Sequence, residues 1–293
     1  MSALRFTEVA SLAVLAFSAA MQARAGREAL RRFLVEAALL GASSWLAEDL
    51  SIRWFGFYAY PEGWLLRLDR VPLMVGVIWP FVILSARDVV RSLLGPRRLP
   101  PAGMAALAGL LICFDASLVE PVAVRAGLWA WSEPGVFAVP PIGIAGWGVF
   151  GAVCTLWLEV AGRTGRPWLR FLLPLVAPPL ANGLLVVLWW GGLRWVLRGE
   201  WPLAAVLCAS LGASALFLFL ARDHRASASL DLMAPRAAGA LLFFGLLAAR
   251  FDAGLAAYAA SFAPPYLWIT RWRQPSAGDT ATPPPGAGLR ATP

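Results

Sequence analysis

The chain has 293 residues, of which 59% are hydrophobic and 14% charged, and its formal net charge is +8. A soluble globular domain has about 45–50% apolar and about 25% charged residues, so this composition excludes an ordinary water-soluble enzyme. All 25 basic residues are arginine, which excludes lysine Schiff-base chemistry. They lie mostly at the ends of apolar runs, where arginine residues set the orientation of membrane helices. This placement does not suggest binding of nucleic acid.

The chain has little capacity for metal or thiol chemistry. It contains a single histidine, so the histidine clusters of membrane iron oxygenases are excluded. The three cysteines lie singly in apolar runs, and their spacing predicts neither a zinc site nor a disulfide framework. We therefore expect no metal and no cofactor. The residue types left for chemistry are Asp, Glu, Arg, Tyr and Trp.

Hydropathy predicts an all-α fold, a polytopic transmembrane helix bundle with about eight spans, each close to the roughly 20 residues that cross a bilayer. The predicted spans are residues 6–23, 29–50, 71–92, 101–121, 138–161, 169–192, 201–221 and 236–262. Residues 1–270 are expected to form a single transmembrane domain. Residues 271–293 are rich in Pro, Gly and Thr and are expected to be a disordered tail.

Several carboxylates lie inside these spans or at their ends, where a charged group costs about 2.5–3.5 kcal/mol at the helix centre and often marks function. They are Glu36, Glu48, Asp49, Asp115, Glu120, Glu159 and Asp252. The second, fourth and eighth spans run in the same direction. We therefore expect Glu48, Asp49, Asp115, Glu120 and Asp252 to lie in one half of the membrane.

Each acid also has a structural interpretation. Glu48 and Asp49 could pair with Arg53, and Asp252 could pair with a cation from another helix. The helical spacing of four predicts ion pairs of Glu36 with Arg32 and of Glu159 with Arg163. Pro121 is expected to end the helix just after Glu120. Asp115 has no arginine within one turn, so burial favours its neutral, protonated form.

Two connections on the same side are aromatic: Trp54-Phe55-Gly56-Phe57-Tyr58-Ala59-Tyr60-Pro61 and Gly127-Leu128-Trp129-Ala130-Trp131. They could form an interfacial belt, but their position beside buried acids favours a lined pocket. Asn182 follows Pro178-Pro179, where we expect a broken helix, and it is either a polar lock or a pocket wall. The predicted binding residues are Tyr58, Tyr60, Trp129, Trp131, Trp147, Asn182 and Asp252.

Two blocks of sequence resemble an integral-membrane carotenoid biosynthesis family, which includes bisanhydrobacterioruberin hydratase and the carotenoid 1′-hydratases. The first block is Glu48-Asp49, the run Phe55–Tyr60, Val71-Pro72-Leu73 and Trp79. The second block is Asp115, Glu120-Pro121, the run Gly127–Trp131, Gly135, Val139-Pro140 and Gly146-Trp147. Together the blocks cover about 100 residues in the family's order, whereas the last three spans carry none of its motifs.

This resemblance implies a metal-independent hydratase, a hydro-lyase that adds water to a terminal isoprenoid double bond of a long acyclic carotenoid. A carboxylic acid would protonate the alkene, aromatic faces would stabilise the tertiary cation, and a second carboxylate would take a proton from water. Asp115 is the predicted acid, and Glu48 or Glu120 is the predicted base. An exchange of roles among Asp49, Asp115 and Glu120 is also compatible with the sequence.

Other functions remain open on the sequence alone. The same cation could close a ring, as in a membrane carotenoid cyclase. A proton-coupled transporter and a non-catalytic carotenoid- or lipid-binding subunit also suit buried acids. The expected partners are a carotenoid or polyprenoid substrate and the lipid bilayer, with other enzymes of the pathway as conceivable additions. The arginine-only composition is typical of a GC-rich bacterial genome, which implies the bacterial inner membrane.

Overall fold

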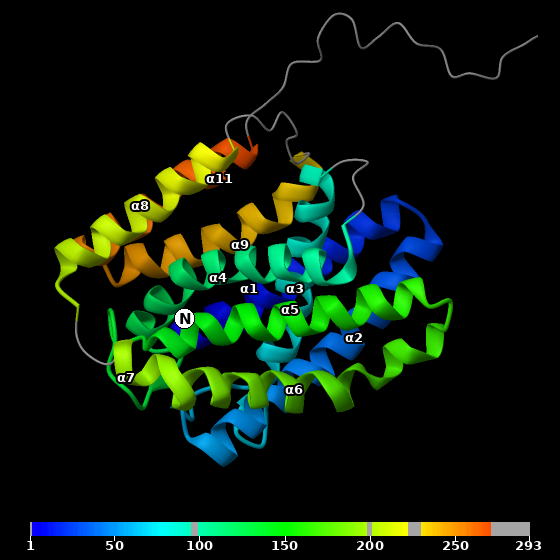
Figure 1. Ribbon diagram of the computed structural model, residues 1–293, viewed down its shortest axis with the longest axis horizontal. Coiled ribbons are helices and arrows are strands. Elements are labelled where there is room, and N and C mark those ends of the chain that lie inside the picture. Colours follow the sequence, from blue (N-terminus) through cyan, green and yellow to red (C-terminus); the bar gives the residue numbers. More distant parts are fainter. Residues whose placement is uncertain (1, 95–98, 198–200, 222–229, 271–293) are drawn as a thin grey trace, which may run out of the picture.

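The structure, a computed structural model, describes residues 2–94, 99–197, 201–221 and 230–270 as a bundle of helices (Figure 1). The first helices are α1 (Ala3–Arg24), α2 (Arg27–Leu50), α3 (Leu73–Leu94), α4 (Pro101–Ala126) and α5 (Pro141–Arg163). The later ones are α6 (Leu173–Leu188), α7 (Arg194–Leu197), α8 (Leu203–Ala221), α9 (Leu230–Ala249), α10 (Ala253–Ser261) and α11 (Ala263–Thr270). The predicted all-α polytopic bundle is confirmed.

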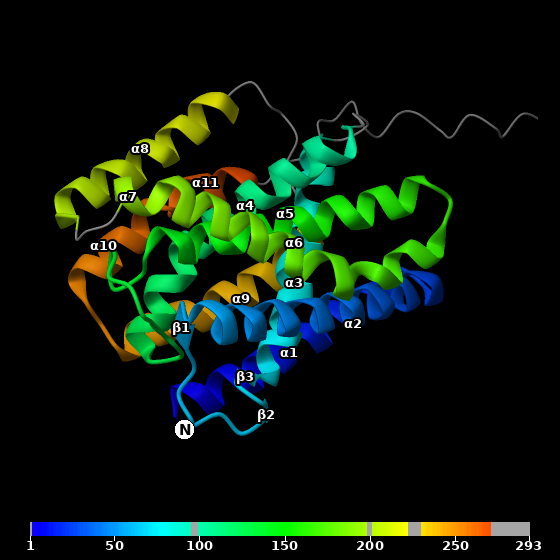
Figure 2. The same ribbon diagram turned by 60° about the horizontal axis from the view of Figure 1, so that its bottom comes forward.

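Short elements connect these helices. Two π-helical segments, η1 (Ser51–Phe55) and η3 (Trp189–Leu193), extend α2 and α6, and a 3₁₀ segment, η2 (Pro167–Leu172), precedes α6. Two small antiparallel pairings join the connections: β1 (Tyr58–Ala59) pairs with β4 (Ala130–Trp131), and β2 (Arg67–Leu68) pairs with β3 (Val71–Pro72). Figure 2 shows β1, β2 and β3 near the marked N-terminus.

Six stretches of the described chain are long and apolar enough to cross a membrane. They comprise α1, α3, α4, α5, the run Pro167–Leu193 and Leu232–Ala249 in α9. α2 has 24 residues but carries many charged groups, and the apolar part of α8, Leu203–Phe219, is shorter. These two account for the remaining predicted spans. The predicted tail at residues 271–293 lies outside the described residues.

Two proline-based expectations are wrong, and the predicted last span is not one helix. α4 continues through Pro121 and ends at Gly127, which has a positive φ of 76° and caps the helix. α6 passes Pro178 and Pro179 without a break. Packed membrane helices tolerate proline because neighbouring groups satisfy the freed backbone atoms. The chain breaks instead before Asp252, whose Oδ1 accepts the Leu255 N–H at 2.8 Å and starts α10.

The helices approach closely where glycines meet. In both views α2, α5 and α6 lie side by side, while α8 lies at the outside of the bundle (Figures 1 and 2). α2 crosses α3 at Gly41 and Gly76, and α4 crosses α5 at Gly109 and Gly148. Small residues at such crossings let two backbones pack in contact, which is the main attraction available between helices in lipid.

A Gly41→Ala substitution should destabilise the bundle. The added Cβ would lie 2.6 Å from the Gly76 carbonyl oxygen, so α2 and α3 would have to separate. Overpacking of this kind costs about 1–3 kcal/mol. The matched control is Gly183→Ala in α6, where no atom lies within 4 Å of the added Cβ. Thermal unfolding in detergent should show a lower midpoint for Gly41→Ala alone, and equal midpoints would contradict this.

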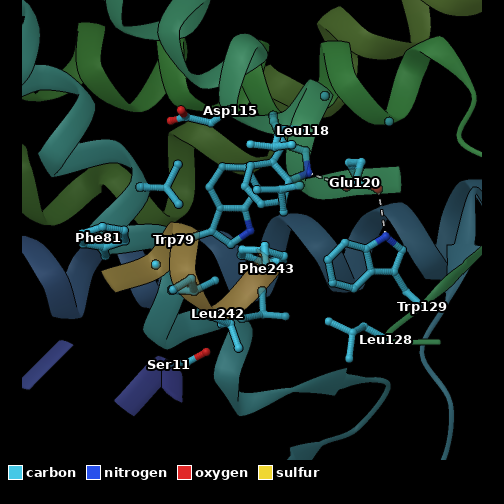
Figure 3. Close-up of a pocket in the computed structure, with 18 of the residues that line it drawn as sticks. Ser11, Trp79, Phe81, Asp115, Leu118, Glu120, Leu128, Trp129, Leu242 and Phe243 are labelled. Carbon is cyan, nitrogen blue, oxygen red and sulfur yellow. Dashed lines mark hydrogen bonds between the residues drawn. The ribbon is translucent and has the colours of Figure 1, made fainter. Parts of the chain in front are cut away.

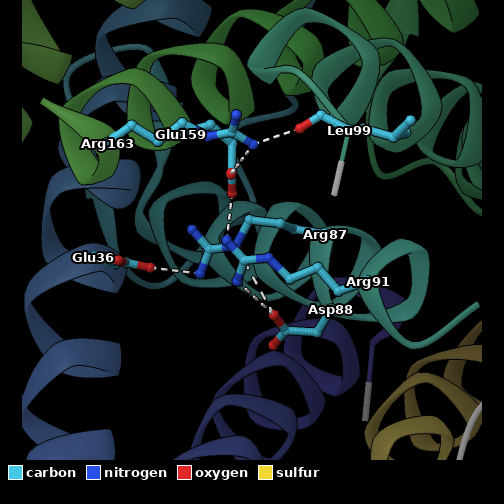
Figure 4. Close-up of polar contacts among 7 residues, drawn as sticks. All are labelled: Glu36, Arg87, Asp88, Arg91, Leu99, Glu159 and Arg163. Carbon is cyan, nitrogen blue, oxygen red and sulfur yellow. Dashed lines mark hydrogen bonds and ion pairs between the residues drawn. The ribbon is translucent and has the colours of Figure 1, made fainter. Parts of the chain in front are cut away.

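An ionic network connects charged side chains of α2, α3 and α5 (Figure 4). The Arg87 guanidinium on α3 donates to Glu36 on α2 at 2.7 Å, so the predicted pairing of Glu36 with Arg32 is wrong. Arg91 pairs with Glu159, and Arg163 lies 4.0 Å from Glu159, as its spacing predicted. The network ties α2, α3 and α5 together, which gives Glu36 and Glu159 a structural role.

Candidate functional site

A cavity of about 760 Å³ lies inside the bundle, lined by side chains of α1 to α6, the aromatic connections and α9 to α11 (Figure 3). Its volume falls within the range of about 300–1,000 Å³ that small-molecule sites occupy. The lining is predominantly apolar, and its acidic side chains are Glu48, Asp115 and Glu120. Figure 3 shows Glu120 and Trp129 pointing toward each other, with Asp115 on another part of the wall.

Glu48 lies in the last turn of α2 and accepts three hydrogen bonds from aromatic side chains. The Tyr58 and Tyr60 hydroxyls donate to its Oε2, the latter at 2.9 Å, and the Trp79 indole N–H donates to its Oε1 at 3.0 Å. Gly56, with φ of 60°, ends η1 and turns the chain into β1, which contains Tyr58 and is followed by Tyr60. Trp79 comes from the second turn of α3.

Glu120 also accepts three hydrogen bonds from aromatic side chains, and the donors are indole N–H groups. It lies in α4, is 2% exposed, and accepts the N–H groups of Trp129 and Trp131 at Oε2, both at 2.9 Å. The Trp147 indole on α5 donates to its Oε1 at 2.6 Å. The tryptophans of β4 and the connection reach Glu120 because Gly127 adopts the left-handed conformation that turns the chain back along α4.

The donors to the two carboxylates pack against each other in three pairs. The ring centroids are 4.7 Å apart for Tyr58 and Trp131, and 6.1 Å apart for Tyr60 and Trp129. Trp79 and Trp147 lie 4.7 Å apart. We call Glu48, Glu120 and these six aromatic residues the acid cluster. It brings together the predicted site residues Glu48, Glu120, Tyr58, Tyr60, Trp129, Trp131 and Trp147.

Within the described residues, neither carboxylate of the acid cluster has an ion-pair partner. Both are held by neutral hydrogen-bond donors, the hydroxyls and indole N–H groups of the six aromatic residues. Burial raises the pKa of Tyr58 and Tyr60 well above the usual range, and the neighbouring Glu48 carboxylate raises it further. Both hydroxyls therefore stay protonated, and they keep donating, at any physiological pH.

Asp115 is not the isolated acid that its sequence neighbours indicate. The Arg236 guanidinium pairs with its Oδ2, the Tyr266 hydroxyl donates to its Oδ1, and Arg236 also donates to the Ser85 hydroxyl at 2.9 Å. α9 begins at Leu230, six residues before the predicted span, so Arg236 lies within the helix and beside the cavity. Asp115 therefore has a counter-ion from another helix.

The remaining predicted residues are divided between the cavity and its surroundings. Asn182 lines the cavity and also locks α6 to α2, because it accepts from the Ser51 hydroxyl at 2.7 Å and donates to the Ala47 carbonyl at 3.2 Å. Both interpretations of Asn182 therefore hold. Asp49 does not line the cavity, and it pairs with Arg53 at 2.6 Å, as predicted.

Asp252 does not line the cavity either. One of its carboxylate oxygens caps α10, and the other lies 3.8 Å from Arg125 of α4, a cation from another helix as predicted. Both side chains are more than a third exposed, so this ion pair contributes little stability. Asp252 therefore has a local structural explanation, and its predicted contact with substrate remains a prediction.

Sequence reasoning missed three side chains of the site. Trp79 belongs to the quoted motif but was not assigned a role, although its distance from Pro72 equals that of Trp147 from Pro140. Arg236 is the first residue of the predicted last span and was not assigned a role. Tyr266 lies beyond the predicted last span, where no motif marks it. The equal proline–tryptophan spacing was the one sequence signal that could have identified Trp79.

Fold and site together define a class of protein: an integral-membrane helix bundle whose buried cavity presents carboxylates and aromatic faces. The model of a family described as carotenoid biosynthesis protein matches residues 8–215, and the chain belongs to this family. No curated protein and no solved structure matches the chain. The matched region contains the whole acid cluster, whereas α9, with Arg236, lies outside it.

Proposed function

We propose that this protein adds water to a terminal isoprenoid double bond of a long acyclic carotenoid. Family membership supports a role in carotenoid biosynthesis, and the cavity adds the chemistry. The observation that carries the proposal is the acid cluster: two carboxylates that have no cation partner among the described residues, held by six aromatic donors at the wall of an apolar cavity. Such a site binds a hydrocarbon and offers it a proton.

The acid cluster contains the groups that hydration needs. One carboxylic acid transfers its proton to the terminal alkene, and the positive charge develops on the tertiary carbon. Water attacks that carbon through its oxygen, and the second carboxylate takes the proton that the water loses. The product is a tertiary alcohol. One carboxyl group of the pair has lost a proton, and the other has gained one. General acid–base catalysis of this kind contributes about 10²–10⁴-fold to a rate.

Aromatic faces stabilise the cation without forming a bond to it. A desolvated cation over an aromatic ring gains about 2 kcal/mol. Tyr58, Tyr60, Trp129 and Trp131 face the cavity beside both carboxylates, so they are suited to the developing charge. Their polar hydrogens are engaged by Glu48 and Glu120, which fixes the ring planes before the substrate arrives. Fixed dipoles of this kind need no rearrangement during the reaction.

Asp115 belongs to the same cavity but has a different role in this proposal. It is paired with the Arg236 guanidinium, whereas Glu48 and Glu120 accept from neutral donors, so we assign proton donation to the Glu48–Glu120 pair rather than to Asp115. Asp115, Arg236 and Tyr266 then face the polyene further from the reacting end. We place the protein in the bacterial inner membrane, where the substrate dissolves.

Mass spectrometry of the product tests the proposal directly. The protein is expressed in a host that accumulates an acyclic carotenoid, and extracts are compared with those of the host alone. A product heavier by one water is expected. A product of unchanged mass with a shortened chromophore would support the cyclase instead. Absence of conversion with several acyclic carotenoids, while the folded protein co-purifies with pigment, would support a binding subunit.

A further inference from the structure

The acid cluster is assembled from two copies of one sequence pattern. Each copy has a helical glutamate, then Gly-x-aromatic-Ala-aromatic, then Val-Pro at the start of the next helix, then a tryptophan seven residues after that proline. The first copy runs from Glu48 through Gly56–Tyr60 to Trp79, and the second runs from Glu120 through Gly127–Trp131 to Trp147. Both glycines have a positive φ, of 60° and 76°.

The two copies pair with each other as a twofold axis requires. In the antiparallel pairing of β1 with β4, Ala59 lies opposite Ala130, which is its equivalent in the other copy. Tyr58, the residue before Ala59, lies opposite Trp131, the residue after Ala130. The three aromatic pairs that connect the two copies follow the same rule. Each joins one donor of Glu48 to one donor of Glu120.

The helices of each copy are also equivalent. α2 packs on α3 in the first copy and α4 packs on α5 in the second, and each crossing has glycine in contact with glycine. α2 and α4 both end, and α3 and α5 both begin, at the acid cluster. The copies therefore have the same orientation in the membrane, and the axis relating them runs along the membrane normal.

One chemical difference separates the two halves. Glu48 accepts from two tyrosine hydroxyls, whereas both equivalent donors to Glu120 are tryptophans. A hydroxyl both donates and accepts, so it can pass a proton on, but an indole N–H only donates. Tyr60 is partly exposed and is followed by the exposed residues Pro61 and Glu62. The donors of Glu48 can therefore relay a proton to it, whereas the indole donors of Glu120 cannot.

We propose that the duplicated halves have divided the reaction: Glu48 is the proton donor, reloaded through Tyr58 and Tyr60, and Glu120 is the carboxylate that receives the proton of the attacking water. This assignment rests on the proposed hydration. Glu48 gives its proton to the alkene, and water adds to the cation as its proton moves to Glu120. A tyrosine then passes its hydroxyl proton to Glu48 while accepting one from water, and Glu120 returns its proton to water.

The test compares a single turnover with continuous turnover in purified protein in lipid nanodiscs. A Tyr58→Phe/Tyr60→Phe variant keeps both rings but has no exchangeable hydroxyl. With enzyme in excess, each molecule uses the proton it already holds. With substrate in excess, Glu48 must be reloaded. We expect the ratio of the continuous rate to the single-turnover rate to fall about tenfold or more, as for loss of one proton-transfer group.

The matched variant is Trp129→Phe/Trp131→Phe in the other half, which removes two donors that pass no proton. It should lower both rates by the same factor and leave their ratio at the wild-type value. Visible absorption of bound polyene confirms that each variant is folded and loaded. An unchanged ratio in the tyrosine variant would overturn the division of roles while leaving hydration intact. Failure of the wild type to hydrate any acyclic carotenoid would overturn the proposed function itself.

Discussion

Replacing Glu120 with glutamine should reduce hydration by about 10²–10⁴-fold, the contribution of one general acid–base group. Glutamine cannot take the proton of the attacking water. Its amide N–H₂ would also face an indole N–H donor, since Trp129, Trp131 and Trp147 supply donors to both oxygens of Glu120. The measurement is product formed per folded protein, by mass spectrometry, in the expression host and with purified protein.

The control for this variant is Glu159→Gln at the opposite end of the bundle. Glu159 is also a buried helical glutamate, 9% exposed, but it pairs with Arg91 and does not line the cavity. The Glu159→Gln variant should lose thermal stability and keep its activity per folded protein. Equal loss of activity in both variants would indicate that Glu120 acts through the fold alone. Wild-type activity in Glu120→Gln would exclude Glu120 from the reaction.

Replacing Asp115 with asparagine should cost about 3–5 kcal/mol of stability, because it leaves Arg236 buried without its counter-ion. The two side chains are 15% and 9% exposed, and they join α4 to α9. The measurement is the thermal unfolding midpoint in detergent, with bound polyene followed in the visible spectrum. Activity per folded protein should fall far less than in Glu120→Gln, because Asp115 is not the proton donor in this scheme.

A paired change separates charge from packing at this position. Asp115→Leu/Arg236→Met removes both charges and keeps apolar volume, so it should recover much of the lost stability, as replacing both partners of a buried pair often does. Failure of the double variant to exceed Asp115→Asn in stability would contradict the ion-pair explanation. Loss of hydration equal to that of Glu120→Gln, with the fold intact, would restore Asp115 as the predicted acid.

Hydropathy was sufficient to predict the bundle, because the bilayer allows few alternatives to long apolar helices. It could not place the helix ends. Pro121 and Pro178 remain inside helices, whereas α9 ends near Asp252, a helix-capping residue type. Such boundaries depend on which backbone groups the neighbouring helices satisfy, and a single segment of sequence does not contain that information.

The aromatic half of the site was predictable, because Glu48 and Glu120 each precede a local glycine–aromatic pattern in the chain. Interaction partners that lie far apart in the sequence were not predictable. Asp115 and Arg236 are separated by 121 residues, and only the packing of α9 against α4 brings them together. The sequence neighbours of Asp115 therefore indicated a neutral acid, whereas the folded chain supplies it with a counter-ion.

The pairing of β1 with β4 restricts how the cavity exchanges its contents. Ser132 donates from its backbone N–H to the Phe57 carbonyl at 2.8 Å, and Glu8 of α1 accepts the N–H groups of Leu65 and Leu66. The two connections are thus fastened to each other and to the first helix. A polyene dissolved among acyl chains is therefore expected to pass sideways between helices, so that lipid fluidity rather than loop opening governs its residence time.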